Sequence, residues 1–339
     1  MRAVFDARQE RHDPQFFLVN GAMRPSPEQP ERVARLKAGA ERAGCTFEAP
    51  ADHGLGPIAA VHSAEYVDFL RTIYPRWQRI EGAGPEVIPN IHPARRSDGY
   101  PKSAVGQAGW HQGDTACPIS EHTWESAYWS AQTAVSGAEA LLTGEQAVYA
   151  LSRPPGHHAF ADLAGGFCFL NNSAIAAAHL LRAGRRPAIL DVDVHHGNGT
   201  QGIFYARSDV LTVSLHADPE RFYPFYWGYA QERGEGAGIG ANLNLPLARG
   251  TRDEDYLRAL DTALRRIEAF GADAVVVALG LDAHENDPFQ GLAISTPGFA
   301  RITAAVRALG LPTLYVQEGG YLSDDLGPNL SSALEGAQG

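Results

Sequence analysis

The stretch Ala188-Ile-Leu-Asp-Val-Asp-Val-His-His-Gly-Asn-Gly-Thr200 joins an apolar run to two alternate aspartates and a histidine pair. In a β-strand, alternate side chains share one face, so Asp191, Asp193 and His195 are expected to point the same way. Open α/β sheets bind their ligands at the carboxyl ends of their strands. Two carboxylates and one imidazole at such an end predict a metal site. The alternative is a surface strand whose charges are merely solvated.

Other segments of the chain have the same apolar, β-branched character as this strand, and amphipathic segments separate them. The predicted strands are residues 148–151, 188–192, 210–215, 274–281 and 312–316, and the predicted helices are residues 123–142, 172–182, 253–270 and 297–309. The strands are too apolar to be half solvated, which favours a parallel sheet covered on both faces. The alternation predicts a single α/β domain over residues 1–339 with right-handed crossovers.

Composition limits the classes of partner. The chain has 339 residues, 44% hydrophobic and 20% charged, with a formal net charge of −11. An acidic chain without a Lys/Arg block is not expected to bind nucleic acid or an anionic membrane surface. No apolar run approaches a membrane span, and the first five residues are too short and too soon charged to form a signal peptide.

The cysteines Cys45, Cys117 and Cys168 are widely spaced and odd in number. A disulfide framework is therefore not expected, and each cysteine is predicted to be a small packed side chain in a cytoplasmic protein.

Residues 79–122 differ from the rest because they are rich in glycine and proline and show little periodicity. A loop this long inside a compact domain is usually a lid, an interface or a binding segment. Its aromatic and basic content suits a rim or a dimer contact, although a disordered excursion is the alternative; the side chains concerned are Arg95, Arg96, Tyr100, Trp110 and His111.

Four predicted strands deliver polar side chains to the same edge of the sheet. His157 and His158 follow residues 148–151, and the two aspartates and His195 follow residues 188–190. Asp282 ends residues 274–281, and Tyr321 follows residues 312–316. No one of these features is specific, but their joint placement after apolar strands predicts a functional site.

The chemistry of these groups predicts hydrolysis of an amide. Asp193, His195 and Asp282 supply three ligands of mixed oxygen and nitrogen type, which suits a catalytic zinc with open positions better than a closed structural site. A neutral imidazole of the neighbouring histidine pair could accept a proton from water. Tyr321, after Gly319-Gly320, could donate a hydrogen bond to the oxyanion that develops on a carbonyl.

The chain resembles the zinc-dependent histone deacetylase family of the arginase/deacetylase superfamily, and in particular its bacterial acetylpolyamine amidohydrolase branch. The matching segments are residues 25–32, Arg153-Pro-Pro-Gly-His-His158, Gly165-Gly-Phe-Cys-Phe-Leu-Asn-Asn172, residues 191–200, Val213-Ser-Leu-His216, Gly280-Leu-Asp-Ala-His-Glu-Asn-Asp-Pro288 and Glu318-Gly-Gly-Tyr321. The resemblance covers nearly the whole chain. It implies a central eight-stranded parallel sheet with helices on both sides.

The resemblance also implies roles for individual residues. His158 is expected to be the general base and then the acid, with His157 as its electrostatic partner. Asp191 would orient His157, and Asn198 would be the partner of His158. Because many family members have an aspartate at the position of Asn198, His158 is expected to be less basic here.

Two kinds of bound cation follow from the resemblance. One zinc ion per chain is expected, with Fe²⁺ or Co²⁺ as alternatives. A structural potassium ion is also implied, held by Asp191, Ser214 and the backbone carbonyls of Asp193, His195 and Leu215.

A narrow apolar tunnel is implied as well. Phe167 and either Tyr223 or Phe222 would flank the chain that carries the acyl group, with ordinary core packing as the alternative for these aromatic residues. Gly166 and its neighbour Gly165 would let the backbone approach the site closely. His196 and His216 are expected to be packed or supporting residues.

The substrate is predicted less sharply. The branch holds distal ammonium groups of polyamines with acidic residues, but Val105 and Ala116 occupy two of the matching positions in the loop. The third position falls near Phe16 or Phe17. Lost charge-assisted hydrogen bonds would each cost about 1.5–3 kcal/mol, and either Asp98 or Asp114 is a candidate to compensate.

The sequence therefore predicts a deacetylase of small acylated amines, such as acetylpolyamines or acyl-lysine, that forms a homodimer through residues 79–122. An amidase for less charged amides and a non-catalytic, metal-dependent binding protein are the alternatives. His284, two residues after Asp282, is a weaker candidate for a ligand because Asn-Asp-Pro follows it. The absence of a second carboxylate in Asp282-Ala-His284 favours one metal over the binuclear manganese site of arginases.

Overall fold

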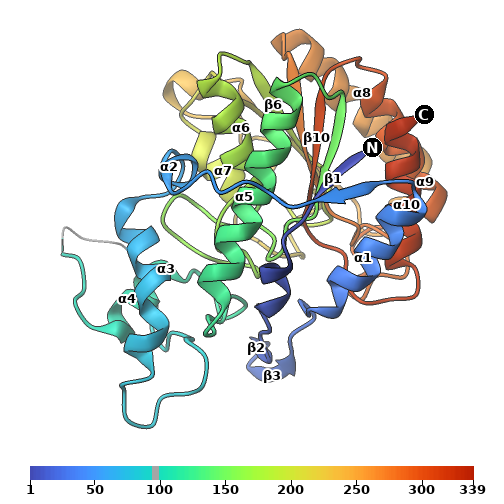
Figure 1. Ribbon diagram of the computed structural model, residues 1–339. Helices are drawn as coiled ribbons and strands as arrows, with labels where there is room; N and C mark the ends of the chain where they lie inside the picture. The colour runs from blue at the N-terminus through green and yellow to red at the C-terminus, as the bar shows by residue number, and fades with distance from the viewer. Residues whose placement is uncertain (94–98) are drawn as a thin grey trace.

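Eight parallel strands form the central sheet of the computed structural model, which describes residues 1–93 and 99–339 (Figure 1). Their spatial order is β4-β1-β5-β10-β9-β6-β7-β8. The strands are β1 Arg2–Val4, β4 Thr46–Glu48, β5 Ala147–Ala150, β6 Pro187–Asp191, β7 Leu211–Ala217, β8 Asn242–Leu247, β9 Ala274–Leu279 and β10 Thr313–Gln317. Strands β2 Phe16–Val19 and β3 Ala22–Pro25 form a separate antiparallel pair. The expected fold class, an α/β domain built on an eight-stranded parallel sheet, is confirmed.

Alternation of side chains along the strands divides the core into two layers. In β9, Ala274 and Val276 belong to one buried cluster, while Val275 and Val277 belong to the other. All four are at most 1% exposed, because helices cover both faces of the sheet. Continuous apolar strands with no polar face are the pattern of buried parallel sheets.

The helices pack on these two faces (Figure 1). The first cluster contains α3 Ala64–Trp77, α4 Ala104–His111, α5 Thr123–Leu142 and α6 Asn172–Arg182. The second contains α1 Glu31–Arg42, α8 Asp253–Phe270, α9 Thr296–Arg307 and α10 Leu326–Gln338. Two short helices, α2 Gly56–Ala59 and α7 Asn198–Phe204, complete the set, with 3₁₀ turns at Ala7–Arg11 and Gly236–Gly238.

Helix boundaries follow local chemistry. Helix α8 has three acidic residues in its first turn, which interact favourably with the positive end of the helix dipole. It ends at Gly271, whose φ of 72° is the left-handed conformation that glycine adopts at helix ends. The predicted boundaries of α5, α6 and α8 agree with the structure, and that of α9 differs by one or two residues.

Strand β6 differs from the predicted strand, residues 188–192, by one residue at each end. It ends at Asp191, so Asp193 and His195 lie in the loop that follows the strand. The expectation that all three polar residues alternate within one strand is therefore wrong. Strand alternation cannot orient residues past the last ladder pair, and hydrogen bonds described below orient them instead.

The described parts of segment 79–122, residues 79–93 and 99–122, contain more regular structure than their composition suggests. They include α4, and Val87 pairs with Ile119 through backbone hydrogen bonds. His111, expected at a rim, is instead 1% exposed and packs against Phe69 at 4.8 Å. The aromatic and glycine content of this segment masked a helix that tertiary packing stabilises. Arg95, Arg96 and Asp98 lie outside the described residues.

Two further expectations concern covalent links and membranes. All three cysteines are free and buried. Within residues 1–93 and 99–339, no helix combines the length and apolarity needed to cross a membrane. The homodimer stays a prediction that sedimentation would test; Ile91 and Tyr100 of the segment are 62% and 40% exposed.

Packing of α1 against α10 depends on a close backbone approach. A Cβ atom added at Gly39 would overlap the carbonyl oxygen of Gly327. We expect Gly39→Ala to lower the free energy of unfolding by about 1–3 kcal/mol, the usual cost of overpacking. Gly56→Ala is the matched control, because nothing lies within 4 Å of its added Cβ. Urea titration measures both, and equal stability of the two variants would contradict the packing argument.

Candidate active site

The ends of four neighbouring strands meet at one edge of the sheet because their register is aligned. Asp191 pairs with Ala278 of β9 and with Ser214 of β7. Gln317 of β10 pairs with Leu279 of β9. The loops that follow these strands therefore start side by side, as the sequence predicts for polar residues placed after parallel strands.

The three predicted ligands converge at this edge. The Nδ1 atom of His195 lies 3.1 Å from Oδ1 of Asp193 and 3.2 Å from Oδ2 of Asp282. One ligand atom from each residue lies within 4.8 Å of the others. The two carboxylates are 0% exposed and His195 is 7% exposed.

These residues fit a divalent cation. Oδ2 of Asp282 is buried and accepts no hydrogen bond. Two buried carboxylates repel each other, so Asp193 raises the pKa of Asp282, an effect that adds to that of burial. A cation compensates both costs, and the oxygen and nitrogen donors are those that zinc accepts.

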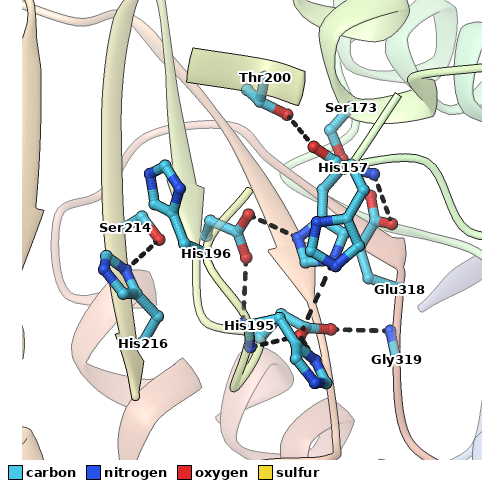
Figure 2. Close-up of polar contacts among 12 residues, drawn as sticks. His157, Ser173, His195, His196, Thr200, Ser214, His216, Glu318 and Gly319 are labelled. Atoms are coloured by element: carbon cyan, nitrogen blue, oxygen red, sulfur yellow. Dashed lines mark hydrogen bonds and ion pairs between the residues drawn. The ribbon is translucent and has the colours of Figure 1, made fainter. Parts of the chain in front are cut away.

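Backbone groups orient the two carboxylates. Gly319 N donates to Oδ2 of Asp193 at 2.9 Å, as Figure 2 shows, and Val194 N donates to Oδ1 of Asp282 at 3.1 Å. A Cβ atom at Gly319 would overlap Asp282, so only glycine allows the loop after β10 to approach. These contacts, rather than strand alternation, aim the ligands at one point.

The two histidines occupy different electrostatic environments. Nδ1 of His157 lies 2.9 Å from Oδ2 of Asp191. Burial lowers the pKa of His157, but the carboxylates of Asp191 and Asp193 outweigh burial and hold that pKa well above its usual value. Burial, together with the charges of His157 and His195, holds the pKa of His158 well below its usual value.

The tautomer of His158 follows from its partner. Its Nδ1 atom lies 2.7 Å from Oδ1 of Asn198, which can only accept a hydrogen bond. Nδ1 of His158 therefore carries the proton, and Nε2 is free to accept one. Asn198 opens α7, which places it beside the turn that carries the histidine pair.

Glu318 is a buried residue of the site. It belongs to the matching segment Glu318-Gly-Gly-Tyr321, but the sequence predicts no role for it. Its Oε2 accepts hydrogen bonds from the N–H groups of Gly156 (2.6 Å) and His157 (3.1 Å), and its Oε1 accepts one from Ser173 Oγ (3.0 Å). Figure 2 shows it between Ser173 and His157. Burial raises its pKa to about 7. Glu318 thus connects the loop after β10 to the histidine turn and to α6.

A second buried group of possible ligands consists of His157, Cys168 and Glu318. Its atoms already have partners, since Nδ1 of His157 faces Asp191, Glu318 holds backbone N–H groups, and the Cys168 thiol donates to Gly166 O at 3.4 Å. This group is therefore a structural cluster.

Contacts to its backbone, its ring and the preceding residues fix the position of Tyr321. Its backbone N–H donates to Oδ2 of Asp287 at 3.1 Å, and its ring packs on Phe289 at 4.8 Å. Arg32 donates to the carbonyl oxygens of Glu318 and Gly320 at 2.7 and 2.6 Å. Burial and nearby carboxylates raise the pKa of the Tyr321 hydroxyl well above its usual value, so it stays protonated.

Arg32, Asp287 and Phe289 were not predicted. Each acts through packing or backbone contacts between segments distant in sequence, and nothing in their local sequence signals that. Arg32 lies in the matching segment 25–32 and Asp287 in the segment 280–288, but neither segment indicates these contacts. Phe289 lies outside every matching segment.

Aromatic rings surround the ligands. Phe222 stacks on His195 at 5.0 Å, and Tyr223 lies perpendicular to His158 at 4.9 Å. Phe167 contacts Tyr321 at 5.9 Å and Phe17 of β2 at 5.6 Å. The structure therefore brings the three predicted tunnel aromatics to the site, and both Phe222 and Tyr223 contribute.

Gly166 is required by close approach. Its φ is 52°, and a Cβ atom there would overlap the His158 ring and lie 2.9 Å from the Tyr223 hydroxyl. A side chain at this position would displace the His158 ring.

His284 does not join the ligands. Its Nδ1 accepts a hydrogen bond from Asn286 N at 3.3 Å and lies 3.9 Å from Asp325. The chain turns immediately after Asp282, which carries His284 away from the ligand atoms. His196 is also separate, because its Nε2 lies 3.2 Å from Asn244 Oδ1.

The loop residues considered for an ammonium group are dispersed. Val105 in α4 packs against the core, and Ala116 is half-buried. Asp114 does reach the site, where Tyr223 OH donates to its Oδ2 at 2.7 Å.

Comparison with known proteins agrees with this geometry. The histone deacetylase domain model matches residues 26–337. The chain belongs to the histone deacetylase family.

Several similar proteins are named acetylpolyamine amidohydrolases. The acetylpolyamine amidohydrolase of Burkholderia pseudomallei is 46% identical over 337 residues, with 99% of this chain and 98% of the relative covered. That of Mycoplana ramosa is 42% identical over 342 residues, covering all of both chains. A crystal structure of acetylpolyamine aminohydrolase from Burkholderia pseudomallei superposes with a TM-score of 0.96, 46% identity and coverage of 99% and 98%. The chain is therefore a hydrolytic enzyme of the deacetylase type.

The Asn198–His158 contact generates a pH prediction. Replacing Asn198 with Asp puts a carboxylate 2.7 Å from Nδ1 of His158, which stabilises the imidazolium. The pKa of His158 should therefore rise, so the acidic limb of the kcat/KM profile should move to higher pH. An unmoved acidic limb, with the zinc content of the wild type, would mean that His158 is not the titrating base.

Proposed function

We propose that this protein is a zinc-dependent amidohydrolase that removes acetyl or short acyl groups from small acylated amines, such as acetylpolyamines or acyl-lysine. The observation that carries the proposal is the convergence of Asp193, His195 and Asp282 beside a neutral imidazole and a protonated tyrosine. The names and full-length similarity of the relatives support the substrate class. A binding protein without turnover would have no use for a base and an oxyanion donor.

Asp193, His195 and Asp282 would hold the zinc ion, with iron(II) or cobalt(II) as alternatives. When bound, it would polarise the substrate carbonyl and lower the pKa of a water molecule.

His158 is suited to accept the proton of that water. Its Nδ1–H is committed to Asn198, and its Nε2 is unprotonated because the pKa of His158 is low. After the amide nitrogen begins to leave, the same Nε2–H can return the proton to it. His157 stays charged beside Asp191 and contributes positive charge to the site.

Tyr321 is suited to stabilise the oxygen of the scissile carbonyl as negative charge develops. Asp287 and Arg32 fix its backbone, so little reorganisation is needed when the charge forms. Phe167, Phe222 and Tyr223 exclude water from the site, which strengthens these electrostatic interactions.

A potassium ion is also proposed beside the catalytic groups, held by Asp191, Ser214 and backbone oxygens of Asp193, His195 and Leu215. His216 Nε2 donates to Gly228 O at 2.8 Å, so its Nδ1 must accept from Ser214 Oγ at 2.7 Å (Figure 2). This leaves the lone pairs of Ser214 available for a cation.

Substitution of the base and of the oxyanion donor tests the function. We expect His158→Ala to reduce kcat by about 10²–10⁴-fold and Tyr321→Phe by about 10²–10³-fold. Zinc content, measured by elemental analysis, should stay near normal in both variants, whereas Asp282→Asn should lose zinc. Unchanged kcat in both His158→Ala and Tyr321→Phe would contradict the proposed mechanism.

A substrate panel separates the two kinds of amide. N-acetylputrescine, acetyl-lysine and a neutral acetanilide are compared with the zinc-loaded protein by acetate release. The names of the relatives lead us to expect a higher kcat/KM for N-acetylputrescine or acetyl-lysine than for acetanilide. A higher kcat/KM for acetanilide would favour the alternative, an amidase for less charged amides. Val105 and Ala116 make this comparison necessary, because neither supplies a carboxylate.

Potassium binding should stabilise the folded chain by mass action. At 100 times its Kd, a ligand of the folded state adds about 2.7 kcal/mol. We expect the melting temperature to be higher in potassium chloride than in choline chloride at equal ionic strength, and Ser214→Ala to reduce that difference. Equal melting temperatures of the wild type in both salts would contradict the site.

A further inference from the structure

Asp114 connects the long inserted segment to the substrate side of the site. Its half-buried carboxylate accepts hydrogen bonds at Oδ2 from Tyr223 OH (2.7 Å) and Gly166 N (3.0 Å). Its Oδ1 accepts one from Ala116 N at 2.9 Å. One side chain therefore joins three segments that are distant in sequence.

The first of these segments is a turn with two left-handed residues. Gly166 and Phe167 have φ values of 52° and 69°, and Gly165 and Cys168 exchange backbone hydrogen bonds across the turn. A left-handed conformation is unfavourable for a non-glycine residue such as Phe167. The turn therefore needs external contacts, and Asp114 supplies one by accepting from Gly166 N.

The second segment is the loop after β7, which carries Tyr223. Its hydroxyl donates to Asp114, and the residues Phe225, Tyr226 and Trp227 beyond it are exposed. Burial and the Asp114 carboxylate raise the pKa of Tyr223 well above its usual value, so the hydroxyl remains a donor. This bond holds the ring perpendicular to His158.

The inserted segment itself is anchored beside the turn. Gly113 N donates to Ala164 O at 2.7 Å, which places Asp114 next to the turn residues. Within residues 1–93 and 99–339, no lysine, arginine or histidine forms an ion pair with Asp114. The carboxylate instead accepts hydrogen bonds from Gly166, in the turn, and from Tyr223, in the loop after β7. We call this turn and this loop the two walls.

We propose that Asp114 is a positioning residue that sets the width of the substrate slot between the Gly166–Phe167 turn and Tyr223. The fixed slot selects amides of unbranched alkyl amines and disfavours aryl amides. The inference rests on the proposed function and adds to it the shape of the amine that the site accepts. The inserted segment 79–122 would thus influence which amides are hydrolysed through the carboxylate of Asp114.

The test separates shape from charge with two linear substrates of equal chain length. N-acetylputrescine carries a terminal ammonium and N-butylacetamide does not, while acetanilide is the aryl comparison. We expect Asp114→Ala and Tyr223→Phe each to lower kcat/KM about 10-fold for both linear substrates, mainly by raising KM. Each variant should also have a smaller ratio of kcat/KM for the linear substrates to kcat/KM for acetanilide. Because one hydrogen bond is shared, the double variant should be little worse than either single variant.

Two further variants serve as controls. Asp114→Asn keeps an acceptor for Tyr223 and Gly166 and should retain part of the selectivity. Thr115→Ala alters the adjacent residue of the same segment, whose hydroxyl donates to Leu18 O at 3.2 Å, and should behave as the wild type. Melting temperatures within a few degrees of the wild type establish that the variants fold.

Specific outcomes would overturn the proposal. A loss confined to N-acetylputrescine in the Asp114 variants, with Tyr223→Phe unaffected, would mean that Asp114 recognises charge directly. Unchanged selectivity in Asp114→Ala would mean that the walls need no such contact. Absence of wild-type turnover would contradict the proposed function instead. In that case, calorimetric Kd values for a linear alkyl hydroxamate and for benzohydroxamate with the zinc-loaded variants still test the slot.

Discussion

Two fully buried carboxylates beside one imidazole nitrogen are the constraint on which the rest of the site depends. Asp193 and Asp282 both lie within 3.2 Å of Nδ1 of His195. Burying each charge costs several kcal/mol unless an opposite charge compensates it. A divalent cation does so, and the backbone donors Gly319 and Val194 keep the carboxylates aimed at it. Folding and chemistry therefore share one requirement at this edge of the sheet.

The surrounding residues divide the electrostatic work. Asp191 keeps His157 charged, whereas burial holds the pKa of His158 low and Asn198 defines the tautomer of its neutral ring. Glu318 accepts hydrogen bonds from backbone N–H groups of the histidine turn, so it couples the loop after β10 to His157 and His158. His158 and Tyr321, in the loops after β5 and β10, are thus held near each other by buried side chains between the two loops.

The inserted segment 79–122 extends this logic to the substrate side. The structure gives it a helix, a buried histidine and, in Asp114, a carboxylate that bonds to both sides of the aromatic slot. Sequence similarity to acetylpolyamine amidohydrolases extends through this segment, although Val105 and Ala116 lack the acidic groups expected there. The proposed role of Asp114 would let the positions of the Gly166–Phe167 turn and Tyr223 contribute to recognition of the amine, in addition to charge.

Sequence alone determined the parallel α/β class, most helix boundaries and the groups at the sheet edge, because apolar periodicity and strand-end chemistry are local and repeat along the chain. The candidate metal ligands Asp193, His195 and Asp282 and the pair His157–His158 could be named from their positions after apolar runs. Tertiary structure decided that β6 stops at Asp191, that His284 turns away and that α4 forms. It also decided the contacts of Arg32, Asp287, Phe289 and Asp114. These depend on hydrogen bonds and packing between segments far apart in the chain, whose distances no local pattern encodes.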